Sequence, residues 1–247
     1  MSLLKAESIT VSFEGTNVIE NVSLTLNEGE TVSLLGVSGG GKTTLFNVLS
    51  GLYSPDEGKV YLDGEDITGK AGKVSYMLQK DLLLPHKRVI DNAALPLILK
   101  GVNKKEARKT AQSHLKEFGL EGAGDKYPHQ LSGGMRQRVA FLRTYLASEK
   151  AALLDEPFSA LDNITKSAIH RWFLSVMDEI KLSVLFVTHD IDEAILLSDR
   201  IYLLTGKPGR ITDEIVINLP GNKSDRNPMS REFIAYKEEI IKKIGVI

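Results

Sequence analysis

The residues best suited to chemistry form a glycine-rich stretch near the start of the chain. Gly36 is followed by four residues and then by Gly41-Lys42-Thr43, which is the spacing of a phosphate-binding loop. Glycines let backbone N–H groups converge on a polyphosphate, and a following helix directs its positive dipole end at the same anion. Lys42 is a mobile charge for the terminal phosphates, and Thr43 offers a hydroxyl to Mg²⁺. A plain glycine-rich turn is the weaker interpretation, because the flanking strand and helix patterns also fit the motif.

Two adjacent carboxylates form a second group. Asp155 and Glu156 end an apolar run that begins at Ala151, which predicts a buried strand with both carboxylates at its C-terminal end. Ligands bind at such strand ends in open α/β sheets. Paired carboxylates there are costly unless they hold a metal or take part in acid–base chemistry. Asp155 suits a Mg²⁺ ligand, and Glu156 suits a base that orients water or accepts its proton.

Two further candidate groups lie at the ends of predicted elements, one at the start of a helix and one after a strand. Ser132-Gly133-Gly134 begins a helical pattern, in which Ser132 is a good N-cap and the glycines leave N–H groups uncovered. This is an anion site or a plain capped helix, and physical arguments alone leave both open. His189 follows a buried run over 183–188. A lone histidine there is more often structural, but beside a phosphate loop and a carboxylate pair it suits a contact to the terminal phosphate.

The elements that must position these groups are strands interleaved with helices. Strands are expected within 3–35 and at 59–62, 73–78, 151–156, 183–188, 201–204 and 211–219. Helices are expected after Thr44, over 103–118, after Ser132, over 164–180 and after Ser230. The apolar stretch 91–100 is interrupted by Pro96, and the basic side of 103–118 is interpreted as a solvated helix face.

Composition sets the class of protein. The 247 residues are 42% hydrophobic and 26% charged, which is typical of a globular protein with a hydrophobic core. The net charge of −1 gives no basic field for nucleic acid, and the absence of cysteine excludes disulfides and thiolate metal sites. No signal peptide is evident and the longest apolar runs, such as 93–99, are too short to cross a bilayer. A cytoplasmic location is expected, with any membrane association made through another chain.

The ordered set of motifs resembles the nucleotide-binding subunit of an ATP-binding cassette (ABC) transporter, over nearly the whole chain. The matching segments are Gly36–Thr44 (Walker A), Gln79 (the Q-loop glutamine), Leu131–Arg138 (the signature motif), Ala151–Glu156 (Walker B), Ser159–Asp162 (the D-loop) and His189 (the switch histidine). The signature motif is far more specific to this family than a phosphate loop alone.

The resemblance implies a role for each matched residue. ATP contacts are implied for Phe13, Gly36, Ser38, Gly39, Gly40, Gly41, Lys42, Thr43, Thr44, Ser132, Gly133, Gly134 and Asp162. Mg²⁺ ligation is implied for Thr43, Gln79 and Asp155, and catalytic roles for Glu156, His189 and Gln79. Spacing alone places Phe13 in ordinary sheet packing, whereas the resemblance places its ring on adenine. Two copies are expected to meet head to tail, with each ATP between one Walker A loop and the partner's signature loop.

Three segments resemble the nitrate/sulfonate/taurine type of importer subunit. They are 156–162, 188–194 and 208–211, and some relatives of this type carry thiamine precursors or other small organic solutes. The resemblance implies a permease partner, an extracytoplasmic solute-binding protein and a location on the cytoplasmic side of the membrane. His86-Lys87 departs from the tryptophan-containing stretch common after the Q-loop. That departure lies near the expected permease contact, so the solute remains open.

The expected fold is an α/β P-loop core with an antiparallel β subdomain and an inserted α-helical subdomain. Within a single domain, 1–79 and 149–220 are expected to form the catalytic core with the β subdomain. Residues 80–148 are expected to form the helical subdomain, and 221–247 the C-terminal helix.

Two other classes of function compete with an importer. A DNA-repair or chromosome ATPase shares these motifs but carries a long coiled coil, and only 87 residues separate Thr43 from Leu131. A regulator of a non-transport complex is the remaining alternative. Leu82-Leu83-Leu84-Pro85 is core or an exposed patch, and as a patch it is expected to line, with Gln79, a groove for a permease helix.

Overall fold

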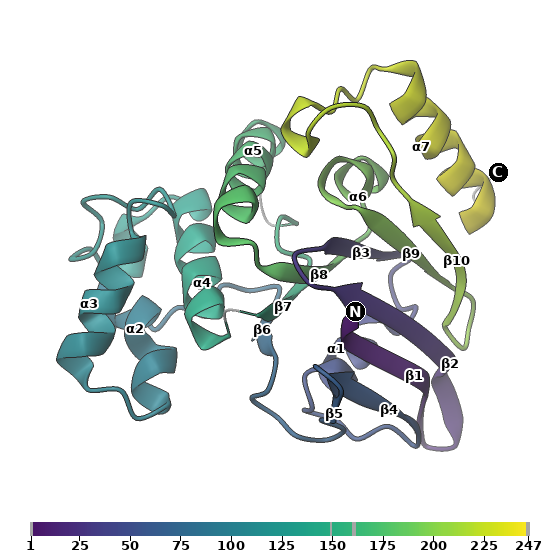
Figure 1. Ribbon diagram of the computed structural model, residues 1–247, viewed down its shortest axis with the longest axis horizontal. Coiled ribbons are helices and arrows are strands. Elements are labelled where there is room, and N and C mark those ends of the chain that lie inside the picture. Colours follow the sequence, from purple (N-terminus) through teal and green to yellow (C-terminus); the bar gives the residue numbers. More distant parts are fainter. Residues whose placement is uncertain (1, 149, 160–161, 246–247) are drawn as a thin grey trace.

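The computed structural model describes residues 2–148, 150–159 and 162–245. They form two β-sheets with helices around them (Figure 1). The two middle residues of the predicted 159–162 segment lie outside these ranges, as does residue 149 at one of the expected subdomain boundaries. No helix in these ranges is long and apolar enough to span a membrane.

The central sheet has six strands in the order β10-β9-β3-β8-β7-β6. Their bounds are β10 (Arg210–Val216), β9 (Arg200–Thr205), β3 (Thr31–Gly36), β8 (Ser183–Thr188), β7 (Ala151–Asp155) and β6 (Ser75–Met77). All neighbours are parallel except the β9–β10 hairpin. Every residue of β3, β7 and β8 is buried, which explains why their sequences are continuous apolar runs rather than alternating ones.

The register of this sheet brings three strand ends together. Leu35 pairs with Thr188, and Asp155 pairs with Val187. The carboxyl ends of β3, β8 and β7 therefore lie along one edge of the sheet, as expected for a doubly wound fold. The phosphate loop, the carboxylates and His189 all begin at that edge.

A second, antiparallel sheet covers helix α1 (Lys42–Leu49). Its strand order is β2 (Thr16–Asn27), β1 (Ser2–Phe13), β4 (Glu57–Leu62) and β5 (Glu65–Asp66). One hydrophobic cluster joins Ile9 and Leu24 of this sheet, Phe46 of α1, and Leu153 and Leu185 of the central sheet. Burial of this shared core, at about 25 cal/mol per Å² of apolar surface, fixes α1 between the two sheets.

Three helices gather at one end of the molecule, α2 (Val89–Leu99), α3 (Lys104–His114) and α4 (Gly133–Ala147) (Figure 1, left). A short 3₁₀ turn, η1 (Pro128–Gln130), precedes α4. Aromatic rings hold this group to the core, since Phe141 packs against Phe118, Trp172 and Phe173 at centroid distances of 5.7, 5.9 and 5.6 Å. The remaining helices are α5 (Asn163–Ile180), α6 (Ile191–Leu197), η2 (Lys223–Asp225) and α7 (Arg231–Ile244), which Ser230 caps.

The predicted fold class is confirmed, and the differences are local. The expected strand 73–78 is shortened to β6, and the helix expected over 103–118 ends at His114, with turns up to Gly119. Pro96 does not interrupt α2, because a proline removes one helix hydrogen bond while the buried Val89, Ala93 and Ala94 anchor the helix. Helix α2 and the short elements β5 and α6 were not predicted. The division of the chain at residues 79/80 and 148/149 stays a prediction.

The apolar stretch after Gln79 divides into two environments. Leu83 is only 8% exposed and packs in the core of the helical group, whereas Leu82 is 53% exposed. Leu84 is partly buried. The expectation of a continuous docking patch is therefore wrong for Leu83, because its side chain fills the core.

Gly36 has no space for a side chain. An added Cβ would lie 2.3 Å from the Leu204 carbonyl oxygen of the neighbouring strand. Gly36→Ala must push β3 away from β9, so we expect it to lower the free energy of unfolding by about 1–3 kcal/mol in urea denaturation. Gly134→Ala, whose added Cβ meets nothing closer than 3.5 Å in helix α4, should leave stability unchanged or raised by up to about 1 kcal/mol. Equal stability of Gly36→Ala and the wild type would contradict the close approach.

Candidate active site

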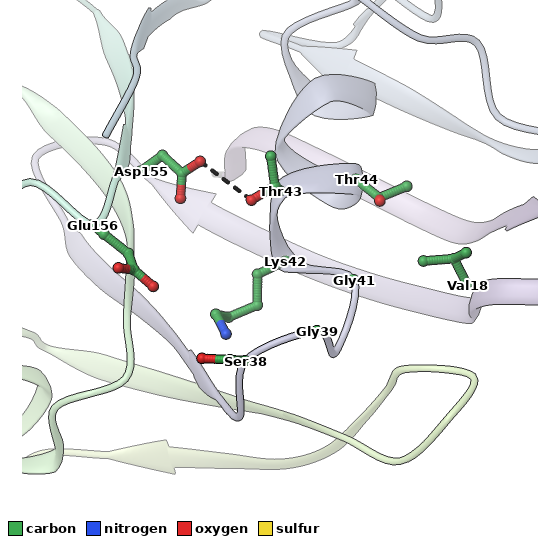
Figure 2. A pocket seen from close by; sticks show the side chains of 9 residues that line it. All are labelled: Val18, Ser38, Gly39, Gly41, Lys42, Thr43, Thr44, Asp155 and Glu156. Atoms are coloured by element: carbon green, nitrogen blue, oxygen red, sulfur yellow. Dashed lines mark hydrogen bonds between the residues drawn. The ribbon is translucent and has the colours of Figure 1, made fainter. Parts of the chain in front are cut away.

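The phosphate loop and the two carboxylates line one pocket (Figure 2). Its volume is about 280 Å³. The lining residues are Val18, Ser38, Gly39, Gly41, Lys42, Thr43, Thr44, Asp155 and Glu156. Eight of these nine were predicted from the sequence as site residues, and Val18, from the second sheet, was not.

The loop requires glycine at two of its positions. Gly39 and Gly41 have φ angles of 79° and 90°, which side-chain-bearing residues rarely adopt. At Gly41 an added Cβ would also lie 2.4 Å from the Ile19 side chain. Gly40, between them, donates its N–H to the carbonyl of Val37 at 3.3 Å. The loop therefore packs closely against β2 at Gly41 and leads directly into α1.

Lys42 is held inside this loop. Its Nζ donates to the carbonyl oxygens of Gly36 at 2.9 Å and Val37 at 2.8 Å, and the side chain is buried. Burial lowers the pKa of the Lys42 ammonium, while the nearby Glu156 and Asp155 act in the opposite direction. Exchange of these carbonyl oxygens for a phosphate would pair the ammonium with a full opposite charge, which strengthens the interaction.

Asp155 lies at the end of β7 and is almost completely buried. Its Oδ2 accepts hydrogen bonds from Thr43 Oγ1 and from the Tyr76 hydroxyl, each at 3.3 Å. Burial raises the pKa of Asp155, and the hydrogen bond from Thr43 is the largest effect that lowers it. The carboxylate thus stands directly beside the first turn of α1, where Figure 2 shows its contact with Thr43.

Glu156 is the centre of a second set of contacts. Its carboxylate accepts from Gln79 Nε2 at 3.0 Å and lies 3.3 Å from His189 Nδ1. Gln79 Nε2 also lies 3.4 Å from Ser159 Oγ. The backbone of Glu156 has a φ of 45°, which is strained for a residue with a side chain. Two residues from separate segments, Gln79 and His189, therefore meet at the carboxylate that was predicted as the base.

A second cavity adjoins the phosphate pocket, because Glu156 lines both. Its volume is about 710 Å³, and it is lined by Gln79, Lys80, Asp81, Leu82, Gly133, Arg136, Gln137, Glu156, Ser159 and His189. The start of α4 thus faces the cavity that holds Glu156.

The remaining predicted residues have separate places. Ser132 caps α4 by accepting from the Met135 N–H at 3.3 Å, and Gly134 lies in the first turn. Asp162 accepts from the Thr165 N–H at 3.0 Å at the start of α5. Phe13, at the end of β1, is 48% exposed and contacts Tyr53 edge-on at 6.2 Å. Phe13 is therefore not in the sheet core, and it lines neither cavity.

The sequence analysis did not identify Tyr76 as a site residue. It also did not identify Asp81 and Arg136, which both line the second cavity. Arg136 Nε donates to Asp81 Oδ2 at 3.2 Å, which joins α4 to the segment after Gln79. Arg136 lies within the signature motif Leu131–Arg138 but received no role there, and Asp81 lies outside the quoted motifs. The sequence of the predicted strand 73–78 does not distinguish the hydroxyl of Tyr76 from that of Ser75.

Comparison with known protein families identifies a match. Residues 19–159 match the family that is described as ABC transporter. The chain belongs to the ABC transporter family. This ABC transporter chain is 46% identical to the formylaminopyrimidine import ATP-binding protein of Halalkalibacterium halodurans, over 83% of this chain and 81% of that protein. It is 37% identical to the nitrate import ATP-binding protein of Synechocystis, over 90% and 86% of the two chains. It is 36% identical to the taurine import ATP-binding protein of Escherichia coli, over 98% and 97%.

Solved structures agree with the family. The ABC transporter chain resembles a cassette solved as a dimer in a post-hydrolysis state with ADP and Pi, with a TM-score of 0.74 and 32% identity. The match covers 87% of this chain and 99% of that one. The chain is an ATP-binding, ATP-hydrolysing subunit of the type found in import systems. The predicted fold, family and ATPase activity are confirmed.

The burial of Asp155 has a measurable cost in the nucleotide-free ABC protein. Its raised pKa means that the stability linked to this group is present below the ordinary aspartate pKa and is lost as the pH rises through the folded-state pKa. Asp155→Asn should therefore raise the melting temperature at pH 7 by a few degrees, since ~1 kcal/mol shifts a domain of this size by about 2–4 °C. The gain should shrink as the pH falls toward 4.

Asp56→Asn is the matched control for that measurement. Hydrogen bonds from the side chain and backbone of Ser12 lower the pKa of Asp56, so its neutralisation should not stabilise the protein. Thermal unfolding of both variants without nucleotide checks the sign, and an Asp155→Asn melting temperature below that of the wild type at pH 7 would show that the charge is well compensated.

Proposed function

We propose that this ABC ATPase powers the uptake of a small solute through a separate membrane permease, from the cytoplasmic side of the membrane. The observation that carries the ATPase part is the meeting of the phosphate loop, Asp155 and Glu156 in one pocket. The relatives support import of a small polar solute, because the solutes in their names are formylaminopyrimidine, nitrate and taurine. The proposed cargo is a small solute that is similar to nitrate, a sulfonate or taurine, or a related organic solute.

The residues at the loop fit Mg²⁺ bound with ATP. Mg²⁺ prefers hard oxygen ligands and is held by one or two carboxylates together with substrate phosphates. Thr43 Oγ1 and Asp155 supply such oxygens 3.3 Å apart, at the start of α1. Gln79 is the third predicted Mg²⁺ ligand. In this structure its amide nitrogen donates to the Glu156 carboxylate. The ion would compensate phosphate charge there.

We assign a separate role in ATP binding or hydrolysis to each of these protein groups. Lys42 binds the terminal phosphates, the loop N–H groups of Ser38–Thr44 surround them, and α1 directs its positive end at them. Glu156 orients the attacking water or accepts its proton, and His189 contacts the same phosphoryl group. Both roles are supported by the His189–Glu156 distance of 3.3 Å.

The signature residues act on a partner's nucleotide in this proposal. Ser132 and the N–H groups of Gly133 and Gly134 neutralise phosphate charge across a head-to-tail dimer, in which Asp162 lies near the same interface. The dimeric ADP- and Pi-bound cassette supports such an assembly. Phe13 stacks on adenine, which its exposure at the end of β1 supports. The ATP-bound dimer transmits its closure to the permease, which receives solute from an extracytoplasmic binding protein.

The sharpest test of the proposal traps the dimer. Glu156→Gln keeps the size of the side chain but removes the base, so it should bind ATP, lose at least about 100-fold in turnover, and accumulate as a dimer in ATP that reverts to monomer in ADP. Sizing chromatography with an ATPase assay measures both effects. Glu156→Gln combined with Ser132→Arg should lose the dimer, because a bulky cation blocks the composite site. Normal turnover in Glu156→Gln would exclude the mechanism.

Substitutions at Leu82 and Leu83 distinguish a role in permease docking from a role in folding. Leu82→Asp changes an exposed side chain on the second cavity, so we expect a folded ATPase with wild-type basal activity that no longer couples to permease-containing membranes. Leu83→Asp buries a charge in the helical core and should cost at least 3 kcal/mol of stability. Unfolding of the Leu82 variant, or normal coupled transport in it, would remove Leu82 from the proposed docking surface.

A further inference from the structure

Tyr76 contributes a hydroxyl to the active site that none of the proposed steps uses. It lies in β6, and its register partner in the parallel strand β7 is Leu153. Side chains two residues apart on a strand share a face, so Leu153 and Asp155 point to the same side of the sheet as Tyr76. This register allows the phenol to reach diagonally past Leu153, to 3.3 Å from Asp155 Oδ2.

The Tyr76 ring is fixed by packing. It lies edge-on to Phe46 at a centroid distance of 6.0 Å and an interplanar angle of 70°. Phe46 is fully buried in α1, the helix that begins with Lys42 and Thr43. A ring wedged against α1 has little freedom to rotate, so the hydroxyl is presented to the carboxylate in a defined position.

Two donors converge on one oxygen of Asp155. Thr43 Oγ1 and the Tyr76 hydroxyl both lie 3.3 Å from Oδ2. Donors from two directions on Oδ2 resist rotation of the carboxylate, which would leave Oδ1 available to a cation. Thr43 is itself a proposed Mg²⁺ ligand and lines the phosphate pocket, whereas Tyr76 is not among its described lining residues. Tyr76 thus donates to the carboxylate without being one of the described lining residues of the phosphate pocket.

We propose that Tyr76 is a positioning residue for the metal, which holds Asp155 in the rotamer that serves Mg²⁺. The inference rests on the proposed function, in which Thr43 and Asp155 take Mg²⁺ together with the nucleotide. Groups that orient a metal ligand typically contribute 10–100-fold to metal affinity. A tyrosine that only fills space beside Phe46 would instead affect nucleotide binding equally with and without the ion.

The experiment compares ADP affinity by calorimetric titration in Mg²⁺ and in EDTA, and takes the ratio of the two affinities. Tyr76→Phe keeps the ring and its contact with Phe46 and removes only the hydroxyl. We expect its affinity in EDTA to stay within twofold of the wild type and its Mg²⁺ ratio to fall about tenfold. The Mg²⁺ concentration for half-maximal ATPase activity should rise by a similar factor.

Tyr202→Phe is the matched control. Tyr202 is a buried tyrosine in the same sheet, and its hydroxyl contacts Thr25 and Arg200 away from the pocket. Its removal should leave the Mg²⁺ ratio unchanged. In an Asp155→Asn background, Tyr76→Phe should change the ratio by less than twofold, because the group it orients is gone. The double variant also lacks the buried charge of Asp155. It therefore keeps the test usable if Tyr76→Phe alone is poorly folded.

Two outcomes would overturn the inference. A wild-type Mg²⁺ ratio in Tyr76→Phe would show that Thr43 and packing suffice to hold Asp155. An equal loss of affinity in Mg²⁺ and EDTA, with a lowered melting temperature, would reduce Tyr76 to a packing residue. If the wild type itself binds ADP no better with Mg²⁺, the proposed metal site is wrong and the role of Tyr76 falls with it. Because that failure appears in the wild type, it is distinct from a failure of the Tyr76 variant alone.

Discussion

The site depends on the parallel pairing of β3, β8 and β7. Thr43 and Asp155 are 112 residues apart in sequence, yet their side chains touch. They meet because each follows a strand whose carboxyl end lies at the same edge of one sheet. A shift of one residue in register would turn Asp155 to the opposite face. All residues of these three strands are buried, and the second sheet fixes α1 beside this edge.

Two groups that carry opposite charges, Lys42 and Asp155, are buried beside this edge. Burial lowers the pKa of Lys42 and raises that of Asp155, so the charged form of each is disfavoured. Their mutual attraction offsets only part of the cost. A ligand that brings negative charge to Lys42 and a cation to Asp155 relieves both at once, as a polyphosphate with a divalent cation does. The structure therefore favours a ligand of that kind for a physical reason that is independent of any motif.

The helical group is connected to the same edge through arginine side chains. Arg143 of α4 donates to the backbone carbonyls of Asp81 at 2.6 Å and Leu82 at 2.9 Å, and Arg136 binds both the Asp81 carboxylate and the Leu131 carbonyl. The segment after Gln79 is thus attached to the helix that begins at Ser132. A movement of α4 must displace this segment, and Gln79 is bonded to Glu156. The second cavity lies between these two attachments.

The sequence by itself determined the motifs and the elements that carry them. The phosphate loop, the two carboxylates, the cap at Ser132 and most of the strands and helices follow from local spacing, whereas α2, β5 and α6 do not. The sequence could not predict that Leu82 is exposed and Leu83 buried, or that a helix, α2, forms and continues through Pro96. Those outcomes depend on neighbours from distant segments.

Tertiary structure alone decided the contacts within the site. Tyr76 reaches Asp155 through the register of two parallel strands, and Glu156 meets Gln79 and His189 from segments 77 and 33 residues away. No local pattern encodes such pairs, since a hydroxyl or an amide has the same sequence neighbours whether or not it has a long-range partner. Local chemistry specified which residues could act, and the packing of the sheet specified which of them act together.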